Sequence, residues 1–237
     1  MDDLNRATEE PAEALADSPL PLSSLFLVFA PLAVGLAAAR WTAVEGYALL
    51  GVIATFVAAW IWLRRRGEGW RDWGLGTLGA RTLGDSILAA AALLFVTSGA
   101  ADLLERTVGW VPNTEAFDVL RGSVPALVVT LLVAWTTAAF GEELLFRGLL
   151  LNGVRRAFGD RVGPGRAAIA GLIVSSVLFG LAHGYQGGAG IVLTGFVGFV
   201  LGALFLAGRN LWLPILVHGI YDTVAIVLVF LGLDHAL

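Results

Sequence analysis

The chain has 237 residues, of which 57% are hydrophobic and 14% are charged, and its formal net charge is −4. Soluble domains carry roughly 25% charged residues, so this composition excludes an ordinary soluble domain and indicates a polytopic membrane protein. The chain has no cysteine, which excludes disulfides and thiolate metal sites, and nothing in its charge pattern points to a nucleic-acid partner.

The chain begins with an acidic, polar stretch, residues 1–21, that is broken by three prolines. Such a stretch is typical of a flexible tail, and it lacks the basic start of a secretory signal. Residues 233–237 form a second short tail, and we assign no role to its histidine, His235.

Between the tails, apolar segments recur at lengths that suit membrane helices, because a span takes about 20 apolar residues. They are residues 22–39, 44–63, 83–104, 124–150, 167–186, 189–207 and 211–232. The sequence therefore predicts an all-α polytopic bundle of seven transmembrane helices, or eight if the long fourth segment is split. The third is the weakest, because acidic residues lie at its ends. Short interfacial helices are predicted at 112–121 and 152–163.

The arginines predict the orientation of the bundle. They cluster in the loop 64–81 and again in 155–166, and cytoplasmic loops are the ones that carry such an excess. With seven spans, both loops are cytoplasmic only if the N-terminus is too. All fifteen basic residues are arginine, which we attribute to bacterial codon usage, so the expected location is the plasma (inner) membrane.

The fourth apolar segment contains the charged motif GEELLFRG, with Glu142, Glu143 and Arg147. An ionised group in hydrocarbon costs a few kcal/mol, so such groups are paired or line a wet cavity. Glu143 and Arg147 are four residues apart, which favours an ion pair on one helix face. Glu142 points roughly 100° away and is not neutralised by that pair. The alternative is a structural ion pair plus an acid that reaches the membrane surface.

Two further segments carry histidine. His183 is the fifth residue of the motif FGLAHG, and His218 begins HGIYD, in which Asp222 is one helical turn further on. Each is open to a purely structural interpretation, as a packing residue or a satisfied polar pair. Glu142, His183 and His218 all fall within roughly 8 Å of the predicted midplane, so they are able to converge.

Two acids and two histidines suit the activation of water for hydrolysis. The same groups could instead hold zinc through Glu142, His183 and His218, with water in the fourth position. Both arrangements lead to amide hydrolysis, and the spacing does not separate them. The common zinc-protease signature HExxH is absent.

The motifs EELLFRG, FGLAHG and HGIYD, in this order on separate apolar segments, resemble the CPBP family of intramembrane proteases. This family includes the eukaryotic CAAX prenyl endopeptidase and bacterial proteins linked to bacteriocin processing or self-immunity. Its pattern is EExxxR, FxxxH and HxxxN or HxxxD. The resemblance covers residues 123–232 and implies a catalytic transmembrane core there, preceded by the transmembrane helices of residues 22–122.

The resemblance also implies roles for the motif residues. Glu142 would activate water together with His183, and Glu143 with Arg147 would brace the site. The implied activity is that of an intramembrane endopeptidase, which acts in the lipid bilayer on a lipidated or membrane-anchored peptide or protein.

By the same resemblance, His218 and Asp222 would bind the scissile carbonyl or the oxyanion. Asp222 stands where the prenyl-endopeptidase relatives often have asparagine, and an ionised carboxylate cannot donate a hydrogen bond. This difference favours a role for Asp222 in orienting His218. Family members are described both as metalloproteases and as metal-free glutamate proteases. The expected cofactor is therefore none or a divalent metal such as zinc, and we favour the metal-free form.

Two other classes of function stay open from the residues alone. One is a non-catalytic immunity or scaffold protein that uses the polar cluster for structure. The other is a proton-coupled transporter, since glutamate and histidine within membranes also mark proton relays. The sequence shows no internal repeat of the kind that many carriers have.

Overall fold

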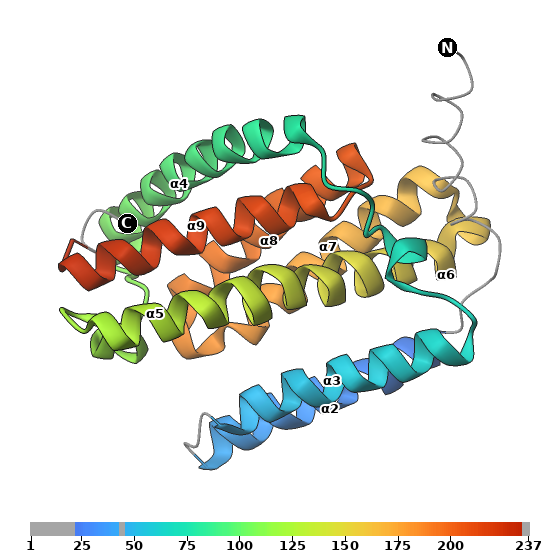
Figure 1. Cartoon of the computed structure of the whole chain (residues 1–237), viewed down its shortest axis with the longest axis horizontal. Helices are drawn as coiled ribbons and strands as arrows, with labels where there is room; N and C mark the ends of the chain where they lie inside the picture. The colour runs from blue at the N-terminus through green and yellow to red at the C-terminus, as the bar shows by residue number, and fades with distance from the viewer. Residues whose placement is uncertain (1–21, 43–45, 234–237) are drawn as a thin grey trace. The chain divides into compact units, whose positions relative to one another are not determined.

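The computed structural model describes residues 22–42 and 46–233. The predicted N-terminal tail and the last four residues, with His235, lie outside these ranges. Every regular element in the described part is helical, which confirms the all-α prediction (Figure 1). The α-helices are α2 (Leu22–Thr42), α3 (Gly46–Arg65), α4 (Ala80–Val108), α5 (Val124–Val133), α6 (Asn152–Val162), α7 (Pro164–Ala182), α8 (Gly187–Gly208) and α9 (Trp212–Leu231).

Seven helical segments within the described ranges are long and apolar enough to cross a membrane, as the sequence predicts. The fourth is a continuous run over Val124–Val162. It starts where the Ser123 hydroxyl accepts a hydrogen bond from the Ala126 amide (3.4 Å), as an N-cap residue does. α5 then passes into the π-helix η4 (Ala134–Leu151), and α6 follows without a break.

The 18-residue η4 contains the motif GEELLFRG. Most π-helices are single-turn bulges inside α-helices, and they occur frequently at functional sites. Outside the long helices, the stretch predicted as an interfacial helix at 112–121 contains the 3-10 helix η3 (Glu115–Leu120).

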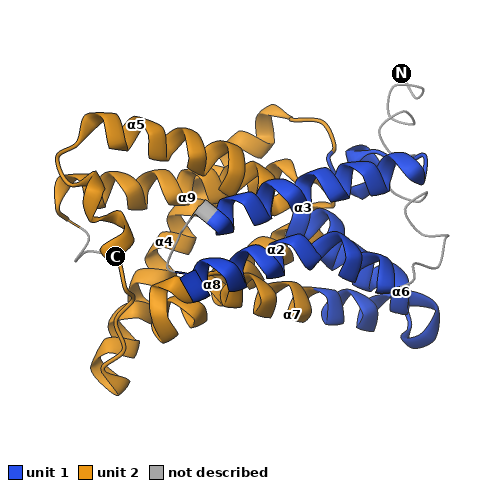
Figure 2. Ribbon diagram, turned by 90° about the horizontal axis from the view of Figure 1, so that it is seen from below, with its two compact units in different colours: residues 1–75, 144–171 blue, residues 76–143, 172–237 orange. Residues whose placement is uncertain are grey.

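The chain forms two compact units, which Figure 2 shows in blue and orange. Unit 1 comprises residues 1–75 and 144–171, and unit 2 comprises residues 76–143 and 172–237. One boundary falls inside η4, directly after Glu143. The sequence predicts a division at residue 122, between N-terminal helices and a catalytic core. The two compact units do not test this division, so it stays a prediction.

In unit 1, α2 and α3 form a closely packed helical hairpin. A side-chain carbon added to Gly35 would lie 2.6 Å from the Gly51 Cα atom, so the two backbones meet where both helices carry glycine. Small residues permit this close approach, which is how helices associate in lipid.

The segment after α3 is fastened to α6 within unit 1 by a charged cluster. Glu68 accepts hydrogen bonds from the Trp73 indole (2.7 Å) and from Arg66 (3.1 Å). The Arg156 guanidinium lies 3.6 Å from Glu68, donates to the Asp72 carbonyl (3.0 Å) and stacks 4.1 Å from the centre of a Trp73 ring. Trp73 is fully buried, so the centre of this cluster is shielded from solvent.

We expect Glu68→Gln to destabilise the protein at neutral pH by roughly 1–3 kcal/mol, the range of hydrogen bonds to charged groups. Burial alone would raise the pKa of Glu68, but hydrogen bonds from Arg66 and Trp73 and the charges of Arg66 and Arg156 outweigh it, so its pKa lies below the ordinary value. A carboxyl group whose pKa is lowered by folding stabilises the protein at pH values above its unfolded-state pKa. This stabilisation is lost as the pH falls through the folded-state pKa. Thermal unfolding from pH 7 to pH 3 should therefore show the two proteins converging in acid.

The control is Asp118→Asn, which breaks an exposed ion pair with Arg121 (3.2 Å). Exposed pairs contribute about 0–1 kcal/mol, so this variant should unfold close to wild type at every pH. An equal loss of stability in the two variants would contradict the account of the Glu68 cluster.

Unit 2 is organised around α9, which packs along α4 and α8 (Figure 1). The shared core is apolar and consists of Ala90, Leu93, Val197, Leu201 and Val217. α9 is also bonded to α4 by its Tyr221 hydroxyl, which donates to Thr97 (3.3 Å). These contacts fix α9, which carries the motif HGIYD.

The crossing of α7 and α8 also depends on glycine. A side-chain carbon on Gly180 would lie 2.5 Å from the Ile191 carbonyl oxygen and 3.0 Å from the Gly195 Cα atom. Gly195 thus provides a close helix contact inside the chain.

Gly180→Ala should destabilise the protein by about 1–3 kcal/mol, because the added methyl group forces two backbones apart. The matched control is Gly99→Ala on α4, where the new methyl group would meet no atom within 4 Å. That change should be neutral or stabilising by up to about 1 kcal/mol, since alanine is the better helix former. Unfolding of both variants in the same detergent tests this, and equal stabilities would contradict the close crossing.

Candidate active site

Five of the six candidate residues lie in unit 2, on three separate elements. Glu142 and Glu143 are on η4, His183 directly follows α7, and His218 with Asp222 is on α9. The sixth, Arg147, is fully buried and lies four residues after Glu143 in η4, beyond the boundary of unit 2.

The centre of the site is a buried pair formed by Glu143 and His218. The His218 Nδ1 atom lies 2.9 Å from Glu143 Oε1 across a sequence separation of 75 residues. Glu143 is 0% exposed and His218 is 5% exposed. The sequence shows only local spacing, and that spacing predicts Arg147 as the partner of Glu143. The pairing of Glu143 with Arg147 stays a prediction.

The other ring nitrogen of His218 faces a second carboxylate. Its Nε2 atom lies 3.4 Å from Asp222 Oδ2, one turn along α9. An imidazolium can donate to both carboxylates, whereas a neutral imidazole can donate to only one. Glu143 and Asp222 together hold the plane of the His218 ring in one orientation.

The tautomer of His183 follows from its hydrogen bond. Its Nδ1 atom lies 2.8 Å from the carbonyl oxygen of Phe179, in the last turn of α7. A carbonyl oxygen only accepts, so Nδ1 must carry a proton, and the neutral ring keeps its lone pair on Nε2. His183 is therefore set up to accept a hydrogen bond through Nε2.

The ring of Phe179 contacts both imidazoles. Its centroid lies 4.8 Å from that of His183 and 6.0 Å from that of His218, the latter edge-on at 77°. Phe179 is 1% exposed, so it forms an apolar wall against which both histidines pack.

Glu142 belongs to the same polar neighbourhood. Glu142 directly precedes Glu143 in η4, and the Phe179 ring joins His183 to His218. The Glu143 carboxylate and the two imidazoles therefore lie close together within unit 2, and Glu142 is the next residue to Glu143.

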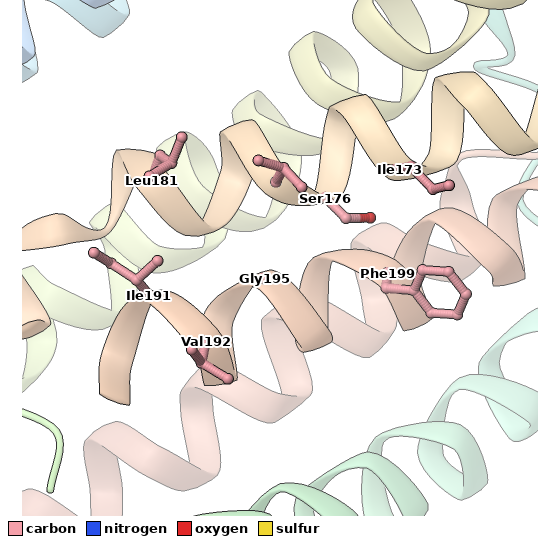
Figure 3. A pocket seen from close by; sticks show the side chains of 8 residues that line it. Ile173, Ser176, Leu181, Ile191, Val192, Gly195 and Phe199 are labelled. Carbon is pink, nitrogen blue, oxygen red and sulfur yellow. The ribbon is translucent and has the colours of Figure 1, made fainter. Parts of the chain in front are cut away.

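A separate groove of about 340 Å³ lies between α7 and α8 (Figure 3). Its lining is apolar except for one hydroxyl: Ile173, Ser176, Val177, Leu181, Ile191, Val192, Gly195 and Phe199. The Ser176 hydroxyl donates to the Leu172 carbonyl (2.7 Å), so its proton is used within α7. The candidate catalytic residues are those of the carboxylate and histidine cluster and not those of the groove.

The residues predicted as metal ligands do not form a metal site in this geometry. Among the described residues, no group of three His, Cys, Asp or Glu is placed to hold a metal ion. Both ring nitrogens of His218 face carboxylates, so an ion shared with Glu142 and His183 would have to take the place of one of these contacts. This donor set does not fit the tetrahedral zinc site considered above.

Comparison with known families finds a match over the part of the chain that carries the site. Residues 124–224 match the model of the family described as type II CAAX prenyl endopeptidase, Rce1-like. This range holds all three motifs and confirms the resemblance to the CPBP intramembrane proteases. The match supports a protease and does not favour the non-catalytic alternative.

One curated relative is an uncharacterized 24.3 kDa protein of Escherichia coli. It is 31% identical over 97 residues, which are 40% of this chain and 42% of that protein. The chain thus matches less than half the length of this relative. No solved structure matches the chain.

Proposed function

We propose that the chain is an intramembrane endopeptidase, which uses activated water to hydrolyse a peptide bond of a membrane-associated substrate. The observation that carries the proposal is the His218 ring held between Glu143 and Asp222, in the same unit as His183 and Glu142. This polar cluster lies on segments that are apolar enough to span a membrane.

In the proposed reaction, Glu142 takes a proton from a water molecule that His183 Nε2 holds by hydrogen bonding. The water oxygen attacks the scissile carbonyl carbon, and the carbonyl electron pair moves onto the oxygen. The protonated Glu142 then gives the proton to the leaving nitrogen, the oxyanion electron pair re-forms the carbonyl, and the carbon–nitrogen bond breaks. Water is consumed, and a carboxylic acid and an amine are released, which become a carboxylate and an ammonium group by proton transfer.

His218, in its imidazolium form, stabilises the oxyanion through its Nε2–H group. Its contact with Asp222 is long, at 3.4 Å, so the oxyanion could replace that carboxylate as acceptor. Glu143 keeps Nδ1 bonded and fixes the ring, the role that a carboxylate has beside a catalytic histidine. Arg147, fully buried in η4, is proposed to brace the carboxylates.

The proposed setting is the plasma membrane of a bacterium, with a cytoplasmic N-terminus, as the arginine distribution predicts. The substrate would be a lipidated or membrane-anchored peptide. The prenylated CAAX peptides of the matched family are the first candidates to test.

The test is cleavage in proteoliposomes. Purified protein is mixed with a prenylated CAAX peptide, its unprenylated form and a peptide with a transmembrane anchor, and mass spectrometry identifies new termini. Wild type should cut at least one of them, and His183→Gln should be slower by about 100-fold or more. His235→Gln removes a histidine outside the motifs and should cut like wild type. Equal rates for all three proteins would contradict the proposal.

A further inference from the structure

η4 is attached to α9 by a tryptophan that belongs to none of the three motifs. The indole Nε1–H of Trp135 donates to Thr223 Oγ1 (3.0 Å). The Thr223 hydroxyl donates in turn to the Gly219 carbonyl oxygen (2.6 Å). The hydroxyl oxygen therefore accepts from the indole while its proton is bonded to Gly219. Two polar bonds thus connect the ring of one helix to the backbone of the other.

The same ring also packs directly on Gly219. A side-chain carbon at this position would lie 2.5 Å from Cζ3 and 2.7 Å from Cε3 of Trp135. No real contact is that short, so only glycine admits the indole here. The ring is held at its edge by Thr223 and at its face by Gly219.

These contacts lie beside the site residues on both helices. Gly219 directly follows His218, and Thr223 directly follows Asp222. Trp135 lies on η4, which carries Glu143. A shift of the indole would therefore change the register of α9 against η4, and with it the 2.9 Å contact between Glu143 and His218.

The other anchors of α9 are different in kind. The Tyr221 hydroxyl bonds to Thr97 on α4. Trp212 lies 6.0 Å from the η4 residue Phe140, ring centre to ring centre, but its indole N–H donates to the Gly76 carbonyl. Trp135 is the residue that combines a hydrogen bond and a close ring contact directly next to the site.

We propose that Trp135 is a positioning residue, which acts through Gly219 and Thr223 to set the His218 ring against Glu143. Its effect on turnover rests on the proposed protease function, whereas its effect on the His218 ring does not. Trp135 thereby sets the orientation of the His218 imidazole, which faces the oxyanion in the proposed reaction.

The test uses variants that disturb each contact separately. Trp135→Phe keeps an aromatic ring without the indole N–H, Thr223→Val keeps the shape of threonine without its hydroxyl, and Gly219→Ala adds the excluded methyl group. In protein labelled with ¹⁵N-histidine, the Nδ1 signal of His218 should shift in all three; it is assigned as the signal lost in His218→Gln. We expect kcat to fall roughly tenfold with little change in KM, because the ring is misplaced and not removed.

Rescue separates positioning from general damage. Trp135→Leu makes room beside residue 219, so combining it with Gly219→Ala should restore part of the kcat lost in Gly219→Ala alone. The matched control is Tyr221→Phe, which loses a hydrogen bond of α9 to α4 and should leave the His218 signal in place. If Trp135→Phe and Thr223→Val both leave this signal and kcat at wild-type values, or if Tyr221→Phe shifts it equally, the proposal is wrong.

The two readouts keep this proposal apart from the protease function. If the wild-type protein cuts no peptide but the three variants shift the His218 signal, the protease function is refuted and the positioning role is supported. If the wild-type protein cuts peptides but the three variants leave the His218 signal unshifted, the positioning role is refuted and the protease function is supported.

Discussion

Glu142→Gln should lower the cleavage rate by about 10²- to 10⁴-fold, the range that a general base contributes. The amide has the size of the carboxylate but cannot take a proton from water. Because Glu142 is only half-buried, its replacement should leave folding intact. The measurement is single-turnover cleavage of the identified peptide in proteoliposomes, with the helical content of each protein checked by circular dichroism.

The control for this change is Glu105→Gln, which removes an exposed carboxylate from the last turn of α4. That variant should cut at the wild-type rate. A Glu142→Gln protein that is folded and equally fast would mean that Glu142 is not the base, and the proposed mechanism would have to be abandoned.

Breaking the pair between Glu143 and His218 should affect both stability and activity. Removing one partner of a buried ion pair costs about 3–5 kcal/mol, because the other is left without compensation. We expect Glu143→Gln to destabilise the protein by about this amount and to reduce cleavage as strongly as loss of the base. The stability effect should exceed that of Glu68→Gln, because Glu143 is 0% exposed.

A double-mutant cycle with His218→Gln measures the pair itself. The double variant should be less destabilised than the sum of the two single variants, by more than about 1 kcal/mol. The comparison is the same cycle at Asp102 and Arg106, an exposed pair at 2.7 Å, where coupling of about 0–1 kcal/mol is expected. Additive effects at Glu143 and His218 would contradict their contact.

The membrane helices could be predicted from hydropathy, because a span is a long local run of apolar residues. Their ends were less predictable. The fifth segment is predicted over 167–186, but α7 covers Pro164–Ala182, because the chain leaves the α-helix for a short 3-10 helix at Gly184–Gln186. The third extends past its prediction to Val108, where the pair between Asp102 and Arg106 keeps polar residues in the helix.

The site was predictable as a set of residues and not as a set of contacts. Spacing of four along a helix places Asp222 beside His218, which the structure has at 3.4 Å. It cannot show that Glu143 meets a ring 75 residues away, because that contact depends on how η4 packs against α9. The contacts of Trp135 could not be predicted from the sequence for the same reason. The π-helix that carries Glu142 and Glu143 was not predicted either.

The most direct test of the account is a distance measurement in lipid bilayers. In protein with ¹⁵N-histidine and with glutamate labelled by ¹³C at its carboxyl carbon, dipolar recoupling by solid-state NMR reports which histidine nitrogen lies close to a glutamate. We predict strong dephasing of the His218 Nδ1 signal, lost in Glu143→Gln and retained in Glu105→Gln. A His218 ring with no glutamate carboxyl near it would contradict the shared site and the protease mechanism built on it.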